Sequence, residues 1–371
     1  MKSKILTLII GIIIGAVITT IAFLIYNNVI RNSQGLERMP MDRNGQMEPH
    51  LDRGMGEPPD KPNGGMPDEN KEKETKASDI DNGQEVTENN IDLSKYNSNI
   101  TITKAGEYTL KGELKNAVLV NAKGNVTLTL DDVNIESTIT AAIANIGTSE
   151  LAIKLADNSN NTLKDGGASE YDACIYSNGK LIIEGNGTLN VYGNQEEGEG
   201  IATETNDITI NGGVINIECQ DDGINAGGDG GLITINDGDI YIKASGDGID
   251  SNKNLIISGG NVYTIGSSVG GDAGIDTDEG FEINGGTVIA LGSDMLEKPE
   301  NSSKQKSVCF TLNSKISKRT EISLRNETGE EIISFEAKED FKTLIISNSK
   351  LTNGTYYLYE NGEKTEYTAK T

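Results

Sequence analysis

The chain has 371 residues and a formal net charge of −25 at pH 7, with 57 Asp and Glu against 32 Lys and Arg. A charge of this sign repels nucleic acid and anionic lipid surfaces, so both are excluded as partners bound through charge. Metal cations are the natural partners instead. Hydrophobic residues make up 35% of the chain and Trp is absent, so the core must be built from Ile, Leu, Val and Ala.

Cysteine and histidine are scarce. Cys174, Cys219 and Cys309 cannot all pair and match no zinc or redox spacing, so we expect them to be small buried apolar residues. The single histidine, His50, lies in a stretch without apolar periodicity. The folded part therefore lacks the commonest general base and the commonest transition-metal ligand.

The first segment in chain order is an uncharged apolar run over residues 5–26, preceded by Lys2 and Lys4. At about 1.5 Å per residue, a helix of this length crosses the roughly 30 Å hydrocarbon layer of a membrane. A cleaved signal peptide is the alternative, but the run is long and no small-x-small site follows it. We predict a single-pass transmembrane signal anchor in residues 1–30, with the bulk of the chain extracellular at the cell membrane.

Residues 31–90 are rich in Pro, Gly, Met and mixed charge, and they show no apolar period. Such a composition cannot bury enough apolar surface to fold, so we predict a disordered linker.

An internal repeat follows the linker. The aligned copies LIIEGNGTLNV, ITINGGVINI, ITINDGDIYI, LIISGGNVYT and FEINGGTVIA contain five anchor residues, 27, 25, 22 and 26 positions apart. These anchors are Ile183, Ile210, Ile235, Ile257 and Ile283. A fixed period of this length is typical of a solenoid.

Each copy consists of short strands separated by Gly and Asn turns and a polar loop. At about 3.3 Å per residue, one copy circles once around a three-sided coil. We therefore predict an all-β fold in which residues 91–295 form a right-handed parallel β-helix with ladders of inward aliphatic side chains. A second anchor, Gly-Ile, recurs at Gly200, Gly223, Gly248 and Gly274.

The pattern changes in residues 296–371, where the glycine repeat stops. The segments SVCFTLNSKI, TEISLRNE, EEIISFEA, KTLIISN and TYYLYENGE alternate like antiparallel strands. We predict a small antiparallel C-terminal β cap that covers the open end of the β-helix, since an uncapped coil exposes unpaired backbone groups.

Acidic residues gather in the loops DDGIN, GDGID and DAGIDTDEG of the repeat. Several recur in register, so carboxylates on coils about 4.8 Å apart would stack as like charges. Calcium resolves this conflict, because it takes about 6 to 8 oxygen ligands from carboxylates, carbonyls and water. The alternative is that these are polar turn residues directed into solvent. The calcium hypothesis assigns as metal ligands Asp221, Asp222, Asp247, Asp250, Asp272, Asp276 and Asp278.

A second candidate surface contains tyrosines. Tyr241 and Tyr263 are predicted to point outward from adjacent coils, one above the other, with Asn216 and Asn190 continuing the row. Aromatic rings beside amides suit sugar rings, which present apolar CH faces and hydroxyl edges. The alternative is a cross-strand pair that only stabilises the sheet. We assign Tyr241, Tyr263, Asn216 and Lys253, which is beside the aspartates in sequence, as sugar-binding residues.

Catalysis is the competing hypothesis, because right-handed β-helices also host pectate lyases and polygalacturonases. The segment Gln220-Asp221-Asp222 resembles the paired aspartates of polygalacturonases, but their histidine and Arg-Ile-Lys segment have no counterpart here. A calcium-assisted lyase needs a strong base, and the repeats contain no arginine, which leaves Lys253. We therefore expect a non-catalytic protein, with a lyase as the alternative.

The NGG-turn repeats, the DGI-type loops and the closing segment VCFTLNSKIS…GEEIISFEAKEDFKTLIISN…GTYYLYENG resemble a clostridial family of carbohydrate-binding β-helix proteins. The resemblance covers about residues 91–362. It implies a fold similar to polysaccharide lyases, an association with calcium, and cellulose-like or acidic, polygalacturonate-like polysaccharide as ligand. It also implies calcium loops at Asp222, Asp247, Asp250, Asp272 and Asp276.

Together these observations predict a cell-surface protein that binds polysaccharide through calcium. The ion would order the loops of adjacent coils and leave a coordination position for a uronate or hydroxyl oxygen. A surface adhesin or spacer with structural calcium, recognising protein, is the alternative.

Overall fold

The computed structural model describes residues 81–167, 171–196 and 198–371. All of them lie in the second of the chain's two structural units, Asp68–Thr371. The predicted anchor and most of the predicted linker, with His50, lie outside the described residues. Within the described ranges, no helix is long and apolar enough to cross a membrane.

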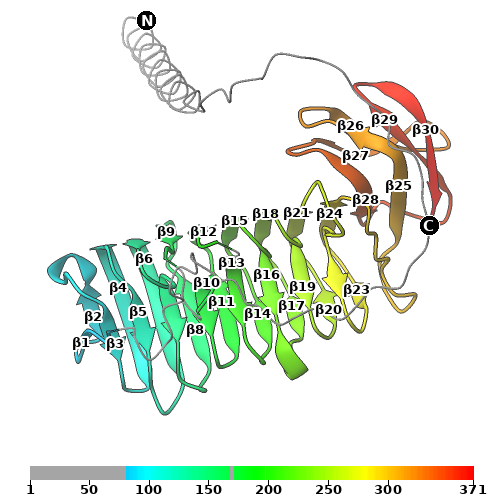
Figure 1. The fold of residues 1–371 in the computed structure, drawn as a ribbon. Coiled ribbons are helices and arrows are strands. Elements are labelled where there is room, and N and C mark those ends of the chain that lie inside the picture. The colour runs from blue at the N-terminus through cyan, green and yellow to red at the C-terminus, as the bar shows by residue number, and fades with distance from the viewer. Residues whose placement is uncertain (1–80, 168–170, 197) are drawn as a thin grey trace, which may run out of the picture. The chain divides into compact units, whose positions relative to one another are not determined.

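Parallel strands of successive coils form the walls of a β-helix, and Figure 1 shows them side by side from cyan to yellow. Among the described residues, the first wall has nine strands. In spatial order they are β1 (Gln84–Glu85), β3 (Ile100–Ile102), β5 (Val118–Val120), β7 (Ile143–Asn145), β10 (Ala173–Ser177), β13 (Glu199–Thr203), β16 (Ile224–Ala226), β19 (Ile249–Ser251) and β22 (Asp276–Thr277).

The second and third walls belong to one larger sheet, which starts with β2 (Asn90–Asp92), β4 (Gly106–Leu114) and β6 (Val126–Glu136). Because β6 is long, it pairs with both of the next two strands. The second wall continues with β8 (Leu151–Leu155), β11 (Leu181–Gly185), β14 (Ile208–Ile210), β17 (Ile233–Ile235), β20 (Leu255–Ile257) and β23 (Phe281–Ile283). The third wall continues with β9 (Asn160–Lys164), β12 (Thr188–Gly193), β15 (Val214–Cys219), β18 (Asp239–Lys243), β21 (Asn261–Ile265) and β24 (Thr287–Gly292). The prediction of an all-β parallel β-helix is confirmed.

Aliphatic ladders form the core, as the repeat predicts. The five anchor isoleucines of the second wall are register partners from coil to coil, and each is fully buried. A second ladder on the third wall consists of Ile215, Ile240, Val262 and Val288. Burying such a side chain contributes roughly 1.5–3 kcal/mol, so short strands suffice when the same contact repeats in every coil.

The glycine of the Gly-Ile anchor is required by a close approach inside the coil. A Cβ atom on Gly223 would lie 2.2 Å from Cγ2 of Ile242 and 2.4 Å from the carbonyl oxygen of Gly248. Gly200 and Gly248 meet equivalent obstacles in their own coils. The recurrence of glycine therefore reflects packing of the loop against the third wall.

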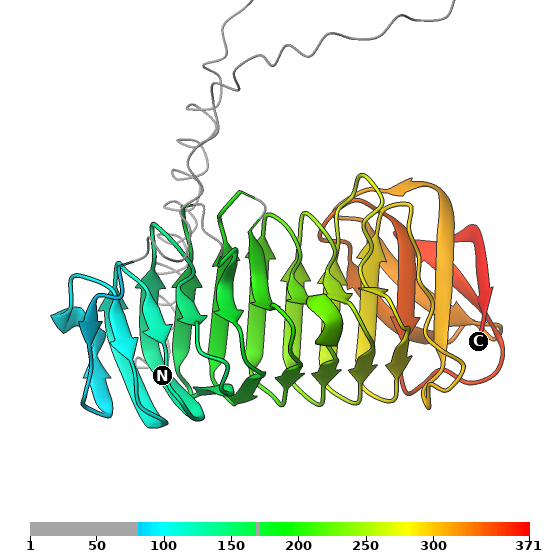
Figure 2. The ribbon, with the colours of Figure 1, turned by 60° about the horizontal axis from the view of Figure 1, so that its bottom comes forward.

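The cap is antiparallel, as predicted, and extends the larger sheet. β28 (Phe341–Ser347) pairs antiparallel with β24, and β25 (Ser307–Ile316) pairs antiparallel with β28. A separate four-stranded sheet follows in the order β27 (Glu331–Glu336), β26 (Glu321–Asn326), β29 (Thr355–Glu360) and β30 (Glu363–Lys370). Figure 2 shows these orange and red strands following the last yellow coil. They enclose a second apolar core that includes Phe310, Phe341 and Tyr356.

Ordered structure begins before the predicted boundary at residue 91. Strand β1 lies in the stretch assigned to the linker, and the N–H groups of Gln84 and Val86 donate to carbonyl oxygens of Asn99 and Thr101. This polar strand is ordered by pairing to β3, which its composition does not show. Two short 3-10 helices, η2 (Leu93–Lys95) and η3 (Gly228–Gly230), complete the described elements.

The three cysteines are free. Cys174 and Cys219 are buried, and Cys309 is partly buried, so the expectation of small apolar residues is confirmed.

Candidate functional site

An acidic row runs along the outer face of the first wall. Asn225 of β16, Asp250 of β19 and Asp276 of β22 are register partners on neighbouring strands. Parallel strands lie about 4.8 Å apart, so the two carboxylates are stacked as like charges. The register predicted from the repeat is confirmed here.

Burial makes this row costly to ionise. Burial first, and the charges of Asp276 and Asp278 second, raise the pKa of Asp250 to about 6. Burial likewise raises the pKa of Asp222 and of Asp247 to about 7, although each carboxylate accepts a hydrogen bond from a backbone N–H group. Neighbouring carboxylates thus add to the cost of ionising Asp250, so a cation is the natural compensation.

One buried acceptor oxygen belongs to the acidic row and another lies beside it. Among the described residues, Oδ1 of Asn225 and Oε2 of Glu297 have no hydrogen-bond partner. The other carboxylate oxygen of Glu297 accepts a hydrogen bond of 2.6 Å from Oγ1 of Thr277, which follows Asp276 in β22. Buried polar atoms normally find partners, so these two oxygens are sites where a ligand would be favourable.

The remaining predicted ligands lie in loops beside the row. Asp221 and Asp222 precede β16, Asp272 precedes β22, and Asp278 follows β22 and is exposed. Lys253 lies in the turn after β19. Thus every predicted metal ligand lies in or next to a strand of the first wall, whereas the predicted tyrosines lie on the third wall.

The donor set suits a hard cation. It consists of carboxylate and amide oxygens, the ligands that calcium prefers. However, no group of three or more His, Cys, Asp or Glu side chains in the described part is arranged to hold a metal ion. The row therefore offers the right chemistry without a preformed carboxylate cage, and calcium would also need carbonyl oxygens and water.

The sequence interpretation missed three acidic side chains near this row, namely Asp172, Glu199 and Glu297. Burial first, and the charge of Asp172 second, raise the pKa of Glu199 to about 9. The signal was present, because Glu199 precedes its Gly-Ile anchor as Asp222 and Asp247 precede theirs. For Glu297, beyond the repeat, no such signal exists.

The tyrosine row lies on the third wall. Asn190, Asn216, Tyr241 and Tyr263 are successive register partners, as predicted. The two tyrosine rings are stacked, with centroids 5.7 Å apart and planes inclined by 27°. Nδ2 of Asn216 donates to Oδ1 of Asn190 at 2.9 Å, which fixes the amides in a ladder.

Tyr263 also holds the cap. Its ring makes an edge contact with Phe335, with centroids 5.8 Å apart. Its hydroxyl group donates to the carbonyl oxygen of Glu336 at 3.3 Å and accepts from the N–H group of Lys338 at 3.4 Å. This tyrosine therefore has a structural role at the cap, and Tyr241, one coil before it, also packs against the cap core.

A groove of about 280 Å³ lies on the third wall beside the tyrosines. It is lined by Val214, Asn216, Asp239, Ile240, Tyr241, Asn261, Val262, Tyr263, Thr287 and Ile289. Lys253 is not among these residues, so it is not brought together with the other predicted sugar-binding residues.

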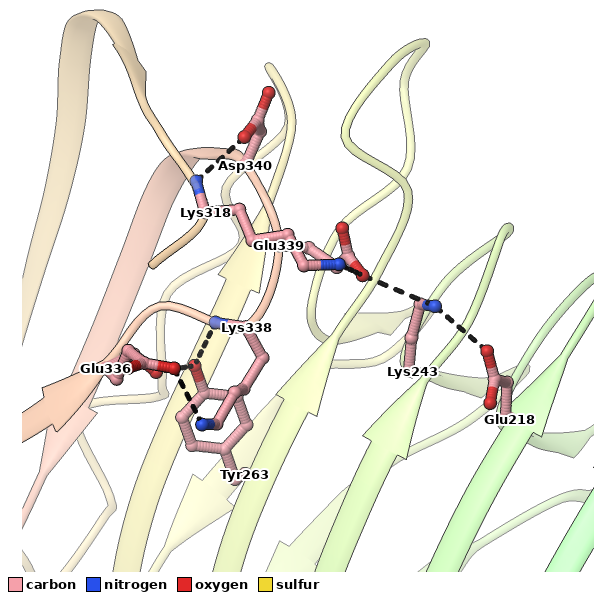
Figure 3. Close-up of polar contacts among 8 residues, drawn as sticks. All are labelled: Glu218, Lys243, Tyr263, Lys318, Glu336, Lys338, Glu339 and Asp340. Atoms are coloured by element: carbon pink, nitrogen blue, oxygen red, sulfur yellow. Dashed lines mark hydrogen bonds and ion pairs between the residues drawn. The ribbon is translucent and has the colours of Figure 1, made fainter. Parts of the chain in front are cut away.

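A chain of ion pairs joins the third wall to the cap beside this groove. Figure 3 shows Lys243 of β18 between two carboxylates, with Nζ 2.9 Å from Glu218 and 3.3 Å from Glu339. Lys318 of the cap lies 2.7 Å from the same carboxylate of Glu339. The loop between β27 and β28 is thus held against the strands that form the groove.

Comparisons with known proteins identify a matching family and similar proteins. A family model described as "Carbohydrate-binding domain-containing protein" matches residues 96–354. A curated protein of the same description from Acetivibrio thermocellus is 32% identical over an alignment of 154 residues, with 38% of this chain and 53% of that protein covered. The chain thus spans about half the length of this curated relative.

A solved structure is also similar, described as the polysaccharide lyase-like protein from C. thermocellum, gadolinium derivative. It shares 24% identity over 60% of this chain and 92% of that chain, with a TM-score of 0.39. The family assignment depends on the family model, which spans more than half of the sequence. The chain belongs to the family of carbohydrate-binding domain-containing proteins.

Proposed function

We propose that the protein binds polysaccharide at the cell surface, and that calcium on the acidic row joins the protein to an acidic glycan. The observation that carries the calcium proposal is the register of Asp250 and Asp276 on β19 and β22, with the pKa of Asp250 raised to about 6. Family membership supports the carbohydrate class of the ligand.

A cation makes the two acidic partners compatible. The protein carries a formal charge of −25, so a uronate chain would be repelled by the bare surface. Calcium accepts oxygens from both sides, because its coordination shell is large and flexible. The orphaned oxygens of Asn225 and Glu297 support this proposal, since each would gain a partner from a cation or its bound water.

We propose binding without catalysis. A lyase would need a base next to the metal-bound uronate, and Lys253 in the turn after β19 is the candidate for that role. The experiment below therefore also measures product formation.

Membrane attachment is part of the proposal. The apolar run of residues 5–26 has the length of a membrane-spanning helix, and the part of residues 31–90 that precedes β1 would separate the β-helix from the bilayer. Protease treatment of intact cells should release the β-helix while the N-terminal segment stays with the membrane fraction. A chain found entirely in the culture medium would contradict the anchor.

The test is affinity electrophoresis of the full-length protein in mild detergent, in gels with polygalacturonate or a soluble cellulose derivative, with calcium or chelator. We expect calcium-dependent retardation in polygalacturonate, lost in Asp250→Asn and kept in Asp237→Asn, an exposed aspartate in a turn outside the row. Retardation in no gel would contradict polysaccharide binding. Unsaturated products would identify a lyase instead.

A further inference from the structure

At one end of the groove on the third wall, the cap packs against the last coil. Ile289 of β24 lies at that end and is only 5% exposed, because β28 pairs with β24 and the cap core covers it. One coil before it, Tyr263 is covered by Phe335 and bonded to the loop after β27. A chain lying along the axis of the coils cannot continue past this point.

The tyrosine stack forms the surface of the groove next to the cap. Tyr263 stacks on one face of the Tyr241 ring, so the opposite face is turned toward β15, where Asn216 lies. On the other side of the pair, Phe335 contacts the ring of Tyr263 edge-on. An aromatic face that is backed in this way suits the apolar CH face of a pyranose ring.

The other end of the groove is open. Val214 at its rim is 38% exposed, and the amides of Asn216 and Asn190 continue the outer row onto the preceding coils. Amide groups both donate and accept hydrogen bonds, so they match sugar hydroxyl groups along such a path. The cap at one end of the groove and the amide row at the other give the groove a direction.

Charge and size restrict the occupant. No Lys or Arg is among the described residues that line the groove, and the carboxylate of Asp239 accepts a hydrogen bond of 2.7 Å from Asn261. A uronate would meet this negative charge with no lysine or arginine lining the groove to offset it, because Lys243 beside the groove is already paired with Glu218 and Glu339. The volume of about 280 Å³ is at the lower limit of ligand pockets, which are roughly 300–1,000 Å³, so there is room for about one sugar unit.

We infer that this groove binds the terminal unit of an uncharged glycan, with the last ring against Tyr241 and the rest of the chain over the amide row. This inference rests on the proposed polysaccharide binding and adds a site on a different wall from the acidic row. The two sites would let one molecule hold an acidic and an uncharged glycan together.

The experiment measures binding of the full-length protein to a soluble cellulose derivative, in chelator, before and after partial acid hydrolysis of the polymer. At equal glycan mass, the number of bound protein molecules should rise in proportion to the number of chain ends. Tyr241→Ala should weaken this binding about tenfold, and Asn216→Ala should weaken it severalfold. The control is Tyr192→Ala, an outward tyrosine of β12 beside Lys164 that does not line the groove.

Binding that does not change with the number of chain ends would overturn the inference, and so would a Tyr241→Ala variant that binds like the wild type. If Tyr241→Ala does not fold, equal binding by Asn216→Ala and the wild type has the same meaning. Calcium-dependent retention by polygalacturonate without any retention by the uncharged polymer would overturn the inference and leave the proposed function standing. Retention by neither polymer would contradict both.

Discussion

The Nζ atom of Lys243 lies 3.3 Å from the carboxylate of Glu339, and this pair joins a strand of the β-helix to the loop that precedes β28. The same ammonium group pairs with Glu218 on the neighbouring strand, and burial of Tyr263 under Phe335 supports the junction from the side. The cap is therefore held by an apolar contact with ion pairs at its edge. These ion pairs are partly exposed to solvent, with 37% of the Lys243 side chain accessible.

We expect the apolar contact to dominate this junction. Lys243→Met should lower the free energy of unfolding by less than about 1 kcal/mol, because exposed ion pairs contribute little. Phe335→Ala should cost about 2 kcal/mol, since a partly buried ring is lost. Urea unfolding followed by fluorescence, at low and high salt, checks both values. A larger effect of Lys243→Met that disappears in high salt would show that the ion pairs hold the cap.

Gly223→Ala should destabilise the β-helix by about 2 kcal/mol or more, because its Cβ would lie 2.2 Å from Cγ2 of Ile242. The matched control is Gly271→Ala, where no atom lies within 4 Å of the added Cβ. Thermal unfolding followed by circular dichroism compares the two. Equal midpoints for both variants would refute the close-approach explanation of the Gly-Ile anchor.

Ile235→Ala should cost about 3 kcal/mol, because it leaves a cavity between Ile210 and Ile257 in a fully buried ladder. Thr234→Ala on the outer face of the same strand should change stability by less than about 0.5 kcal/mol. Both are measured by urea titration. If the two variants were equally stable, the inward direction of the anchor residues would be wrong.

Asp250→Asn should stabilise the protein at pH 8 by about 1 kcal/mol in the absence of divalent cations, after allowance for solvent screening. The folded-state pKa of Asp250 is raised to about 6. The contribution of Asp250 to the free energy of unfolding is therefore most favourable below the ordinary pKa of an aspartate. It is lost as pH rises through about 6, where the folded protein must carry the charge. The stability difference between variant and wild type should vanish near pH 4. A difference that stays constant with pH would contradict the electrostatic cause.

At pH 8, calcium should make the wild type more stable than Asp250→Asn. The wild type should gain thermal stability with calcium and lose it on adding chelator, because binding to the folded state stabilises it by mass action. Asp250→Asn should gain less. Equal gains in both proteins would place the bound ion away from the acidic row.

Much of the fold was predictable, because each coil repeats the same local pattern. The spacing of Ile183, Ile210 and Ile235 gave the ladder register, and the register then placed Tyr241 beside Tyr263 and Asp250 beside Asp276. Stacking of near-identical units converts sequence period directly into neighbours in space. The contacts of the cap with Tyr263 could not be obtained in this way, since no repeat connects residues 263 and 335.

The sequence by itself therefore determined the solenoid, its inward ladders, its outward acidic and tyrosine rows, and the antiparallel character of the cap. Only the tertiary structure decided that the two rows lie on different walls, that the cap packs over the last coil at one end of the tyrosine groove, and that Glu297 lies beside Asp276. The reason is physical. Positions within the repeat are fixed by hydrogen bonds between equivalent strands, whereas the cap is placed by packing between residues that share no period.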